Sequence, residues 1–176
     1  MAGRAAKNTV EAFTAFYQKF LPKVFKYVSY RVSDQFLAED ITSSVFEKAL
    51  TKFDQYDEEK AALSTWVFSI ARNTLIDHFR ANARERNVPL EAAEEKPSEW
   101  LSPEQQAENS EECHILHGCL KKLTAPEQEI VSLKFSAEMT NRQIAGMLGL
   151  SESNVGVILY RAVRKLRKDF EGLSHG

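Results

Sequence analysis

Apolar residues recur every three or four positions through the first part of the chain, a spacing that predicts amphipathic α-helices. Asn8 is expected to cap the first helix, with Glu11 at the capping-box position. The buried stripe of this helix is expected to contain Phe13, Phe16, Tyr17, Phe20 and Leu21. Because Pro22 lacks a backbone donor, the pattern predicts either a kink or a new helix at that point.

Two further helices are expected before residue 86. Asp34 should cap the first of them, whose apolar face is wide and contains Leu37, Ile41, Val45, Phe46, Ala49, Leu50 and Phe53. Residues 54–63 predict a charged loop, after which Ser64 begins a long helix. In this long helix, two sets of side chains alternate in helical register: apolar Trp66, Val67, Ile70, Leu75, Ile76 and Phe79, and polar Arg72, Asn73, Asp77, His78 and Arg80.

The periodicity fails over residues 85–112, which contain many acids, small residues and three prolines: Pro89, Pro97 and Pro103. Such a composition is typical of a flexible acidic linker. One helix is then expected to run to about Lys122, and a strong start signal for the next is made by Thr124, Pro126 and Glu127. The prediction is therefore an all-α fold with two helical domains, residues 8–86 and 111–172, joined by a linker at 87–110.

Residues 140–168 predict a helix-turn-helix with a cationic end. Thr140 can cap the first helix, with Gln143 reaching back to the cap. Gly149 can take the left-handed conformation that ends this helix, and Ser151 can cap the second helix through backbone donors near Asn154. The two helices are expected to cross closely at small Ala145, with the space between them filled by Leu150, Val155 and Ile158.

The second helix of this motif keeps a set of residues for outside contacts: Ser153, Asn154, Gly156, Val157, Tyr160 and Arg161. A recognition helix enters the major groove of DNA in this arrangement. Five cations with no acid among them end the motif, namely Arg161, Arg164, Lys165, Arg167 and Lys168, and they suffice for several phosphate contacts. The alternative is an ordinary helical hairpin whose basic end only complements the helix dipole.

Composition and charge add further constraints. The chain has 176 residues, of which 43% are hydrophobic, enough for one or two small domains. Neither a membrane span nor the apolar core of a signal peptide is visible, so a cytoplasmic location is expected. The formal charge is −2, but residues 85–112 hold nine acids and two bases, so that segment carries −7 and the remainder +5. The overall charge therefore does not argue against DNA binding.

The long helix that begins at Ser64 interleaves aromatic and arginine side chains. Such side chains can stack on bases and hold the backbone of single-stranded nucleic acid. For Trp66 and Phe79, a structural place in the core is the favoured alternative. A lone histidine such as His78 is more often a surface or core residue than a base reader.

Together these stretches resemble the extracytoplasmic-function (group IV) sigma factors of bacterial RNA polymerase. The region 2.2 helix of that family is similar to LAEDITSSVFEKAL, and its regions 2.3 and 2.4 are similar to STWVFSIARNTLIDHFR. Its region 4 is similar to LTAPEQEIVSLKF together with the helix-turn-helix. The matches stand in the family's order and spacing over nearly all of residues 10–170. The resemblance implies a transcription initiation factor, without catalysis or a cofactor of its own.

The resemblance also implies roles for residues of the first domain. In the family, the region 2.2 helix docks on the clamp-helix coiled coil of the largest polymerase subunit, and the matching face, expected to be exposed, contains Glu39, Asp40, Ser43, Phe46 and Glu47. For each carboxylate, a solvated helix surface is an equal alternative. Family members melt the minus-ten element and capture an unstacked base with a loop that matches Lys60, Ala61 and Ser64. The helix that follows reads the strand, and the matching residues are Trp66, Arg72, Asn73, Asp77 and Arg80. Asn73 is the expected base reader.

In the family, region 4 reads the minus-thirty-five element as duplex DNA, and the matching residues are Arg142, Ser151, Ser153, Asn154, Val157, Tyr160, Arg161, Arg164 and Lys165. Many members carry polar or basic residues after the position of Val155, whereas this chain has Gly156, Val157 and Ile158. Hydrogen-bond readout should therefore be thinner, with more weight on DNA shape. The implied partners are core RNA polymerase, promoter DNA in duplex and single-stranded form, and an anti-sigma factor that competes for the same surfaces.

Other functions stay open at this level. A compact CHxxHxC cluster, which could hold zinc or sense thiol chemistry, is formed by Cys113, His114, His117 and Cys119. Helical geometry argues against all four acting at once, since Cys113 and Cys119 lie roughly 240° apart on a helix. A conventional helix-turn-helix regulator, whether or not it responds to metal or thiols, would leave the region 2 resemblance unexplained. An enzyme is the least supported class, because the sequence contains no phosphate loop, nucleophile elbow or paired-carboxylate motif.

Overall fold

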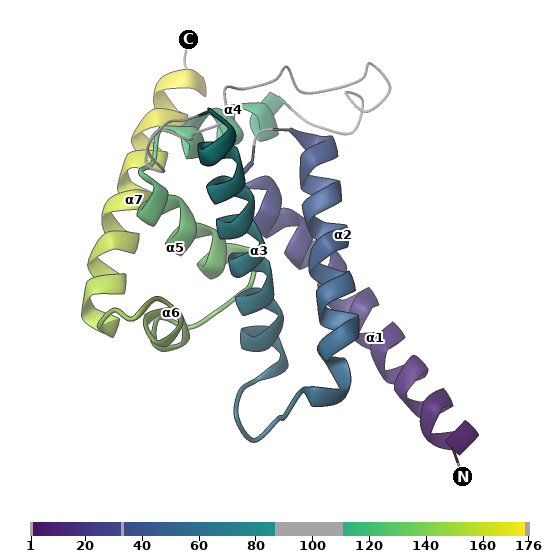
Figure 1. The fold of residues 1–176 in the computed structure, drawn as a ribbon. Helices are drawn as coiled ribbons and strands as arrows, with labels where there is room; N and C mark the ends of the chain where they lie inside the picture. The colour runs from purple at the N-terminus through teal and green to yellow at the C-terminus, as the bar shows by residue number, and fades with distance from the viewer. Residues whose placement is uncertain (1, 33, 87–110, 175–176) are drawn as a thin grey trace.

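The computed structural model describes the backbone of residues 2–32, 34–86 and 111–174, and the side chains of residues 9–32, 34–85 and 115–172. All regular structure in these ranges is helical, which confirms the predicted all-α fold. Figure 1 shows two groups of helices side by side, α1–α3 and α4–α7, called here the N-terminal bundle and the C-terminal bundle. No helix within the described ranges is both long enough and apolar enough to cross a bilayer.

The first helix, α1 (Ala2–Ser29), is continuous through Pro22. It includes Asn8, so the predicted cap at that residue is wrong, as is the alternative of a new helix at Pro22. Pro22 lies on the exposed side of α1, where the carbonyl that loses its backbone donor can bond to water instead. The opposite side is buried and carries Phe16, Phe20, Val24, Tyr27 and Val28.

The helices α2 (Gln35–Lys52) and α3 (Leu63–Arg86) pack on α1 and on each other. Asp34 caps α2 as predicted, because its Oδ1 accepts a hydrogen bond from the Leu37 amide at 2.9 Å. A short 3-10 helix, η1 (Phe53–Gln55), follows α2 and leads into the charged loop. Phe16 lies at the centre of an aromatic cluster that closes this end of the bundle, with rings from Phe13, Phe46, Phe53 and Trp66 around it.

The C-terminal bundle contains α4 (Glu111–Lys121), α5 (Ala125–Phe135), α6 (Asn141–Leu148) and α7 (Glu152–Ser174). Its predicted start and stop signals are confirmed. The Thr124 amide donates to Glu127 at 3.0 Å, and the Thr140 amide donates to Gln143 at 2.9 Å. Gly149 has a φ of 68°, and the Ser151 hydroxyl accepts from the Asn154 amide at 3.1 Å. The short turn between α6 and α7 therefore follows from local chemistry.

The two bundles are in contact, because α5 packs on α1 and α6 packs on α3. One continuous buried core contains Tyr27 and Phe68 from the N-terminal bundle and Ile130, Leu133 and Ile144 from the C-terminal bundle. A second, smaller cluster lies within the C-terminal bundle and contains Leu120, Leu123, Val131 and Ala162. The predicted linker, residues 87–110, lies outside the described residues. The predicted domain limits stay a prediction.

Candidate nucleic-acid interface

A cavity of about 580 Å³ lies between α2 and α3. Its lining contains Lys48, Lys52, Ile70, Arg72, Asn73, Thr74, Ile76, Asp77 and Arg80. Four of these side chains are cations and one is an acid, so the cavity favours an anionic ligand. Asn73 is exposed, and its amide can both donate to and accept from the edge of a base. The cavity therefore offers phosphate-binding charge beside a group that can read a base.

Lys48, one of the four cations of the cavity, is held only loosely. Lys48 donates to the Thr74 hydroxyl at 3.2 Å and lies 4.0 Å from Asp77, and both charged side chains are well exposed. An exposed pair at this distance contributes little, so Lys48 can turn toward a ligand at small cost. The structure brings together Arg72, Asn73, Asp77 and Arg80, which sequence analysis singled out. The cavity also contains Lys48 and Lys52, which were not expected from the sequence. Their i,i+4 spacing, which places two cations on one side of α2, is the signal that could have revealed them.

The other four residues expected at the minus-ten element are not part of the cavity lining. Lys60 lies in the loop before α3, is 82% exposed and pairs with Asp57 at 3.2 Å. Ala61 accepts a hydrogen bond through its carbonyl from the Tyr56 hydroxyl at 2.9 Å. Ser64 lies in the first turn of α3, half-buried. The half-buried Trp66 contacts Phe16, Phe53 and Tyr56, so its position fits the core alternative.

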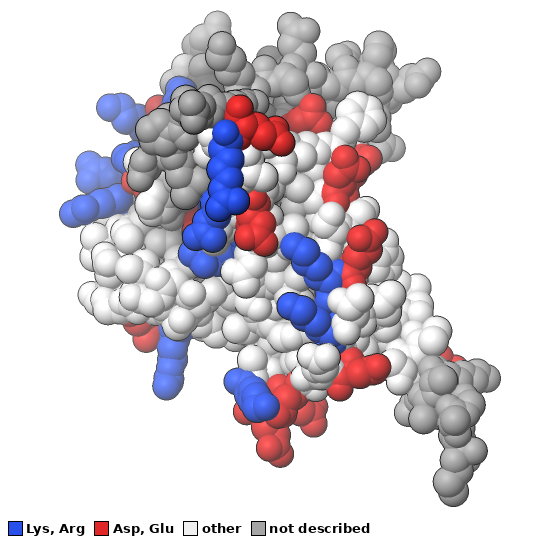
Figure 2. All heavy atoms as spheres, in the orientation of Figure 1, with Lys and Arg blue, Asp and Glu red and all other residues white. Residues whose placement is uncertain are grey.

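The outer face of α2 carries an exposed acidic stripe of Glu39, Asp40 and Glu47, with Ser43 between them, and Figure 2 shows acidic side chains over this helix. Phe46 does not belong to this face. It is 5% exposed and packs against Phe16 and Tyr17 of α1, so its expected exposure is wrong.

Two apolar side chains of α2 stand exposed instead: Phe36 at 76% and Leu50 at 56%. At about 100° per residue they fall on the same face as the acidic stripe, near its two ends. Phe36 is not among the residues expected at this face from the sequence, and the expectation that Leu50 lies on the buried side is wrong. Together with the stripe they form what we call the α2 face: Phe36, Glu39, Asp40, Ser43, Glu47 and Leu50.

The helix-turn-helix presents the side of α7 that sequence analysis expected. Its exposed residues are Ser153, Asn154, Val157, Tyr160 and Arg161, while Val155 is fully buried against α6. Val157 is 45% exposed and Tyr160 67%, so the centre of this side is apolar. Gly156 lies close to α6: a Cβ at this position would be 3.7 Å from the Asn141 side chain. Of the other two expected contacts, Arg142 is exposed on α6, and the Ser151 hydroxyl is engaged in the cap.

The basic end of α7 is exposed at Arg161, Arg164, Arg167 and Lys168, and Figure 2 shows basic side chains projecting from the α7 edge. Lys165 differs, because its ammonium lies 2.6 Å from Oε1 of Glu127, whose side chain is only 11% exposed. Burial alone would raise the pKa of Glu127, but hydrogen bonds from Lys165 and Thr124 outweigh burial and lower this pKa. Lys165 therefore serves the packing of α7 on α5, in addition to any contact with DNA.

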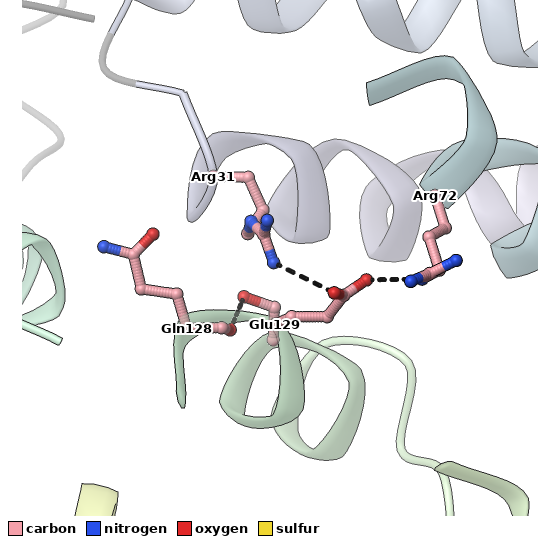
Figure 3. Close-up of polar contacts among 5 residues, drawn as sticks. Arg31, Arg72, Gln128 and Glu129 are labelled. Carbon is pink, nitrogen blue, oxygen red and sulfur yellow. Dashed lines mark hydrogen bonds and ion pairs between the residues drawn. The ribbon is translucent and has the colours of Figure 1, made fainter. Parts of the chain in front are cut away.

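Arg72 of the cavity also faces the C-terminal bundle. Figure 3 shows Glu129, from α5, between Arg31 and Arg72. The Arg72 Nε donates to Glu129 Oε1 at 2.8 Å, and Arg31 Nη1 lies 3.8 Å from Oε2. Tyr27 is fully buried beside them, and burial together with the negative charge of Glu129 raises its pKa. This arrangement has no signal in the sequence, since its members come from three separate helical segments.

The cysteine and histidine cluster falls on α4, as expected for a helix. Cys119 is a free thiol buried in the bundle, and the His117 ring contacts Tyr30 at a centroid distance of 5.8 Å. The side chains of Cys113 and His114 lie outside the described residues. Among the side chains that are described, no three potential metal ligands come together.

Comparison with known proteins places these features in a family. Residues 16–85 match the family model for sigma-70 region 2, and residues 113–166 match the one for sigma-70 region 4. The chain is 28% identical over 165 residues to the ECF RNA polymerase sigma factor BldN of Streptomyces coelicolor, covering 94% of this chain and 62% of BldN. It is 26% identical over 152 residues to SigM of Bacillus subtilis, covering 86% of this chain and 90% of SigM.

Solved structures show the same fold. The sigma factor RpoE of Bartonella quintana, crystallised with the anti-sigma factor NepR, aligns with a TM-score of 0.77 at 21% identity, covering 92% of this chain and 98% of RpoE. CnrH, in complex with the cytosolic domain of CnrY, aligns with a TM-score of 0.62 at 21% identity, covering 97% of this chain and 95% of CnrH. The chain therefore belongs to the extracytoplasmic-function group of the sigma-70 family, the non-catalytic initiation factors that direct RNA polymerase.

Proposed function

We propose that this chain binds core RNA polymerase in the cytoplasm, takes the single-stranded minus-ten element into the cavity between α2 and α3, and reads the minus-thirty-five element with α7. The proposal rests on the presence, in one chain, of two different surfaces whose shape and charge suit DNA. One is a cationic cavity with an exposed amide, suited to an unpaired strand. The other is a convex helix with a basic end, suited to a duplex groove.

At the minus-ten element, Asn73 reads the edge of an unstacked base, and the cations around it hold the flanking phosphates. Extruding a base costs a few kcal/mol, which contacts in a pocket can offset. Arg80 and Lys52 line the cavity and are exposed, so a phosphate can approach them from solvent. The loop residues Lys60, Ala61 and Ser64 stay a prediction for the capture of an unstacked base.

At the minus-thirty-five element, the exposed side of α7 enters the major groove. Ser153, Asn154 and Arg161 supply hydrogen bonds to bases or phosphates. Val157 and Tyr160 are apolar surfaces that suit the methyl group of thymine. Arg164 and Arg167 then hold the phosphates beside the groove.

The α2 face is the proposed docking site for core polymerase. A stripe of three carboxylates suits a basic coiled coil, and exposed Phe36 and Leu50 supply apolar contacts at its two ends. We further propose that an anti-sigma factor holds this chain inactive. The support is that the sigma factor RpoE was crystallised with the anti-sigma factor NepR.

Replacing Asn73 tests the minus-ten assignment. Asn73→Ala should lower the rate of open-complex formation about tenfold, since one lost base contact contributes about 1–3 kcal/mol. The measurement is permanganate reactivity of unpaired thymines on a promoter template, with core binding followed by pulldown. The matched control is Asn154→Ala, which should weaken duplex binding and leave the affinity for a single-stranded minus-ten oligonucleotide unchanged.

Two outcomes would count against the proposal. Equal loss of core binding and promoter opening in Asn73→Ala would remove the base-reading role of Asn73. Duplex binding by the unmodified chain without any binding to core polymerase would instead favour the conventional helix-turn-helix regulator.

A further inference from the structure

The carboxylate of Glu129 is inserted into a group of three residues from the N-terminal bundle, which we call the anion cage: Tyr27, Arg31 and Arg72. The Arg72 Nε donates to it at 2.8 Å, Arg31 Nη1 lies 3.8 Å away, and Tyr27 is fully buried beside them. The side chains of Arg31 and Glu129 are 12% and 15% exposed. Figure 3 shows the carboxylate, carried by α5, pointing between the two guanidinium groups.

The anion cage has more donor capacity than one carboxylate uses. Two cations and a phenolic hydroxyl converge on a single negative charge, so the cage keeps a local charge of +1 even when Glu129 is in place. Within the described part of the chain, Arg31 Nη1 is buried without a hydrogen-bond partner. A buried guanidinium donor normally finds an acceptor, and a phosphate, with its spread of oxygens, would supply one where the carboxylate does not.

The anion cage is also continuous with the cavity proposed for the minus-ten strand. Arg72 belongs to both, because its guanidinium bonds to Glu129 while its side chain lines the cavity beside Asn73 and Arg80. A strand held at Asn73 therefore carries its phosphates toward Arg72. While α5 is in place, the carboxylate of Glu129 holds that guanidinium instead.

We propose that Tyr27, Arg31 and Arg72 bind a backbone phosphate of the single-stranded minus-ten DNA, and that Glu129 occupies this site in its place while the two bundles are in contact. The inference rests on the proposed function, since it assigns a further contact to the same strand. Strand binding and bundle contact then exclude each other at this site, so each weakens the other by the same factor.

The test uses the full chain and a fluorescently labelled single-stranded oligonucleotide of about twelve thymidines, followed by anisotropy. Glu129→Gln should bind it at least about tenfold more tightly than the unmodified chain, because a neutral amide competes poorly for two cations. Adding Arg31→Gln to that variant should abolish the gain and lower the salt slope of log K by about 0.7, the amount expected for one phosphate contact.

The matched control is Glu138→Gln, which removes a different ion pair between the bundles. Glu138 lies 2.5 Å from Lys23 of α1, but it is 69% exposed and neither residue belongs to the anion cage. This variant should bind the oligonucleotide like the unmodified chain. If it gains as much affinity as Glu129→Gln, bundle separation alone explains the effect, and the phosphate assignment is overturned.

Two further results would also overturn the inference. One is no gain in Glu129→Gln. The other is a gain that persists with an unchanged salt slope when Arg31 is replaced, which would make the anion cage a contact between bundles only. Should Glu129→Gln fail to fold, Arg31→Gln in the chain bound to core polymerase gives the same salt-slope test. The oligonucleotide assay contains no polymerase and is therefore independent of core binding. If the chain failed to bind core polymerase, the proposed function would be refuted, but the measured phosphate contact at the anion cage would still hold.

Discussion

Lys165 and Arg164 are neighbours on α7 with different expected roles, and replacing each by glutamine separates them. Arg164 is exposed, so Arg164→Gln should remove one phosphate contact and lower the slope of log K against log salt by about 0.9 on duplex DNA. With the slope lowered by this amount, raising the salt from 50 to 200 mM should weaken DNA binding about threefold less in Arg164→Gln than in the unmodified chain. Lys165 is held by Glu127 at 2.6 Å, so Lys165→Gln should change the slope by less than half as much.

The effects of the two substitutions on stability should be reversed, with Lys165→Gln costing more than Arg164→Gln. Hydrogen bonds to charged groups contribute about 1.5–3 kcal/mol, and because Lys165 is 52% exposed, we expect Lys165→Gln to cost about 1 kcal/mol. For a chain of this size, Lys165→Gln should lower the midpoint of thermal unfolding by about 2–4 °C, while Arg164→Gln should leave that midpoint unchanged. The assays are fluorescence anisotropy over a salt series and thermal unfolding by circular dichroism. Equal slope changes in the two variants, with equal midpoints, would refute this reasoning.

Three other predictions follow from single residues. Gly149→Ala should destabilise the chain by about 1–2 kcal/mol, because a residue with a Cβ is strained at a φ of 68° even though no atom lies within 4 Å of the added Cβ. Gly146→Ala, inside α6 and equally free of clashes, should stabilise the chain by about 0.5–1 kcal/mol. Thermal unfolding of both variants checks this pair of expectations. Because the pKa of Glu127 is lowered in the folded chain, its ionised carboxylate contributes stability above the ordinary pKa of 4.5, and this stability is lost as pH falls through the lower folded pKa. The free energy of unfolding of the unmodified chain should therefore exceed that of Glu127→Gln by less and less as pH falls below 4.5, as measured by denaturant unfolding at a series of pH values. Burial raises the pKa of Cys119, so its thiol should react with iodoacetamide far more slowly in the folded chain than in urea, and equal rates would contradict the buried position.

The turn chemistry of the C-terminal bundle was predictable because each signal acts within a few residues. Thr140, Gly149 and Ser151 satisfy backbone groups of their own helices, so neither bundle contact nor burial elsewhere changes their role. Asp34 is predictable for the same reason. Pro22 was not, because the cost of a proline inside a helix depends on whether water can reach the carbonyl it leaves unpaired, and that depends on the surrounding fold.

The candidate sites were predictable only in part. The face that α3 presents to the cavity follows from helical spacing, which is why Asn73 and Arg80 were placed together. Phe46 is buried because α1 crosses α2 at Tyr17, a contact between segments far apart in the sequence. The insertion of Glu129 into the anion cage depends in the same way on how two bundles meet, which no local pattern records.

Run-off transcription tests most directly whether this chain directs core RNA polymerase to promoters. Purified core polymerase is combined with fragmented DNA from the source genome, with and without the protein. We expect new discrete transcripts that start at a fixed distance from a shared two-part motif, and we expect them to be lost when the α2 face is altered by Glu39→Lys and Glu47→Lys. An absence of new transcripts, together with an absence of binding to core polymerase in the same mixture, would contradict the account.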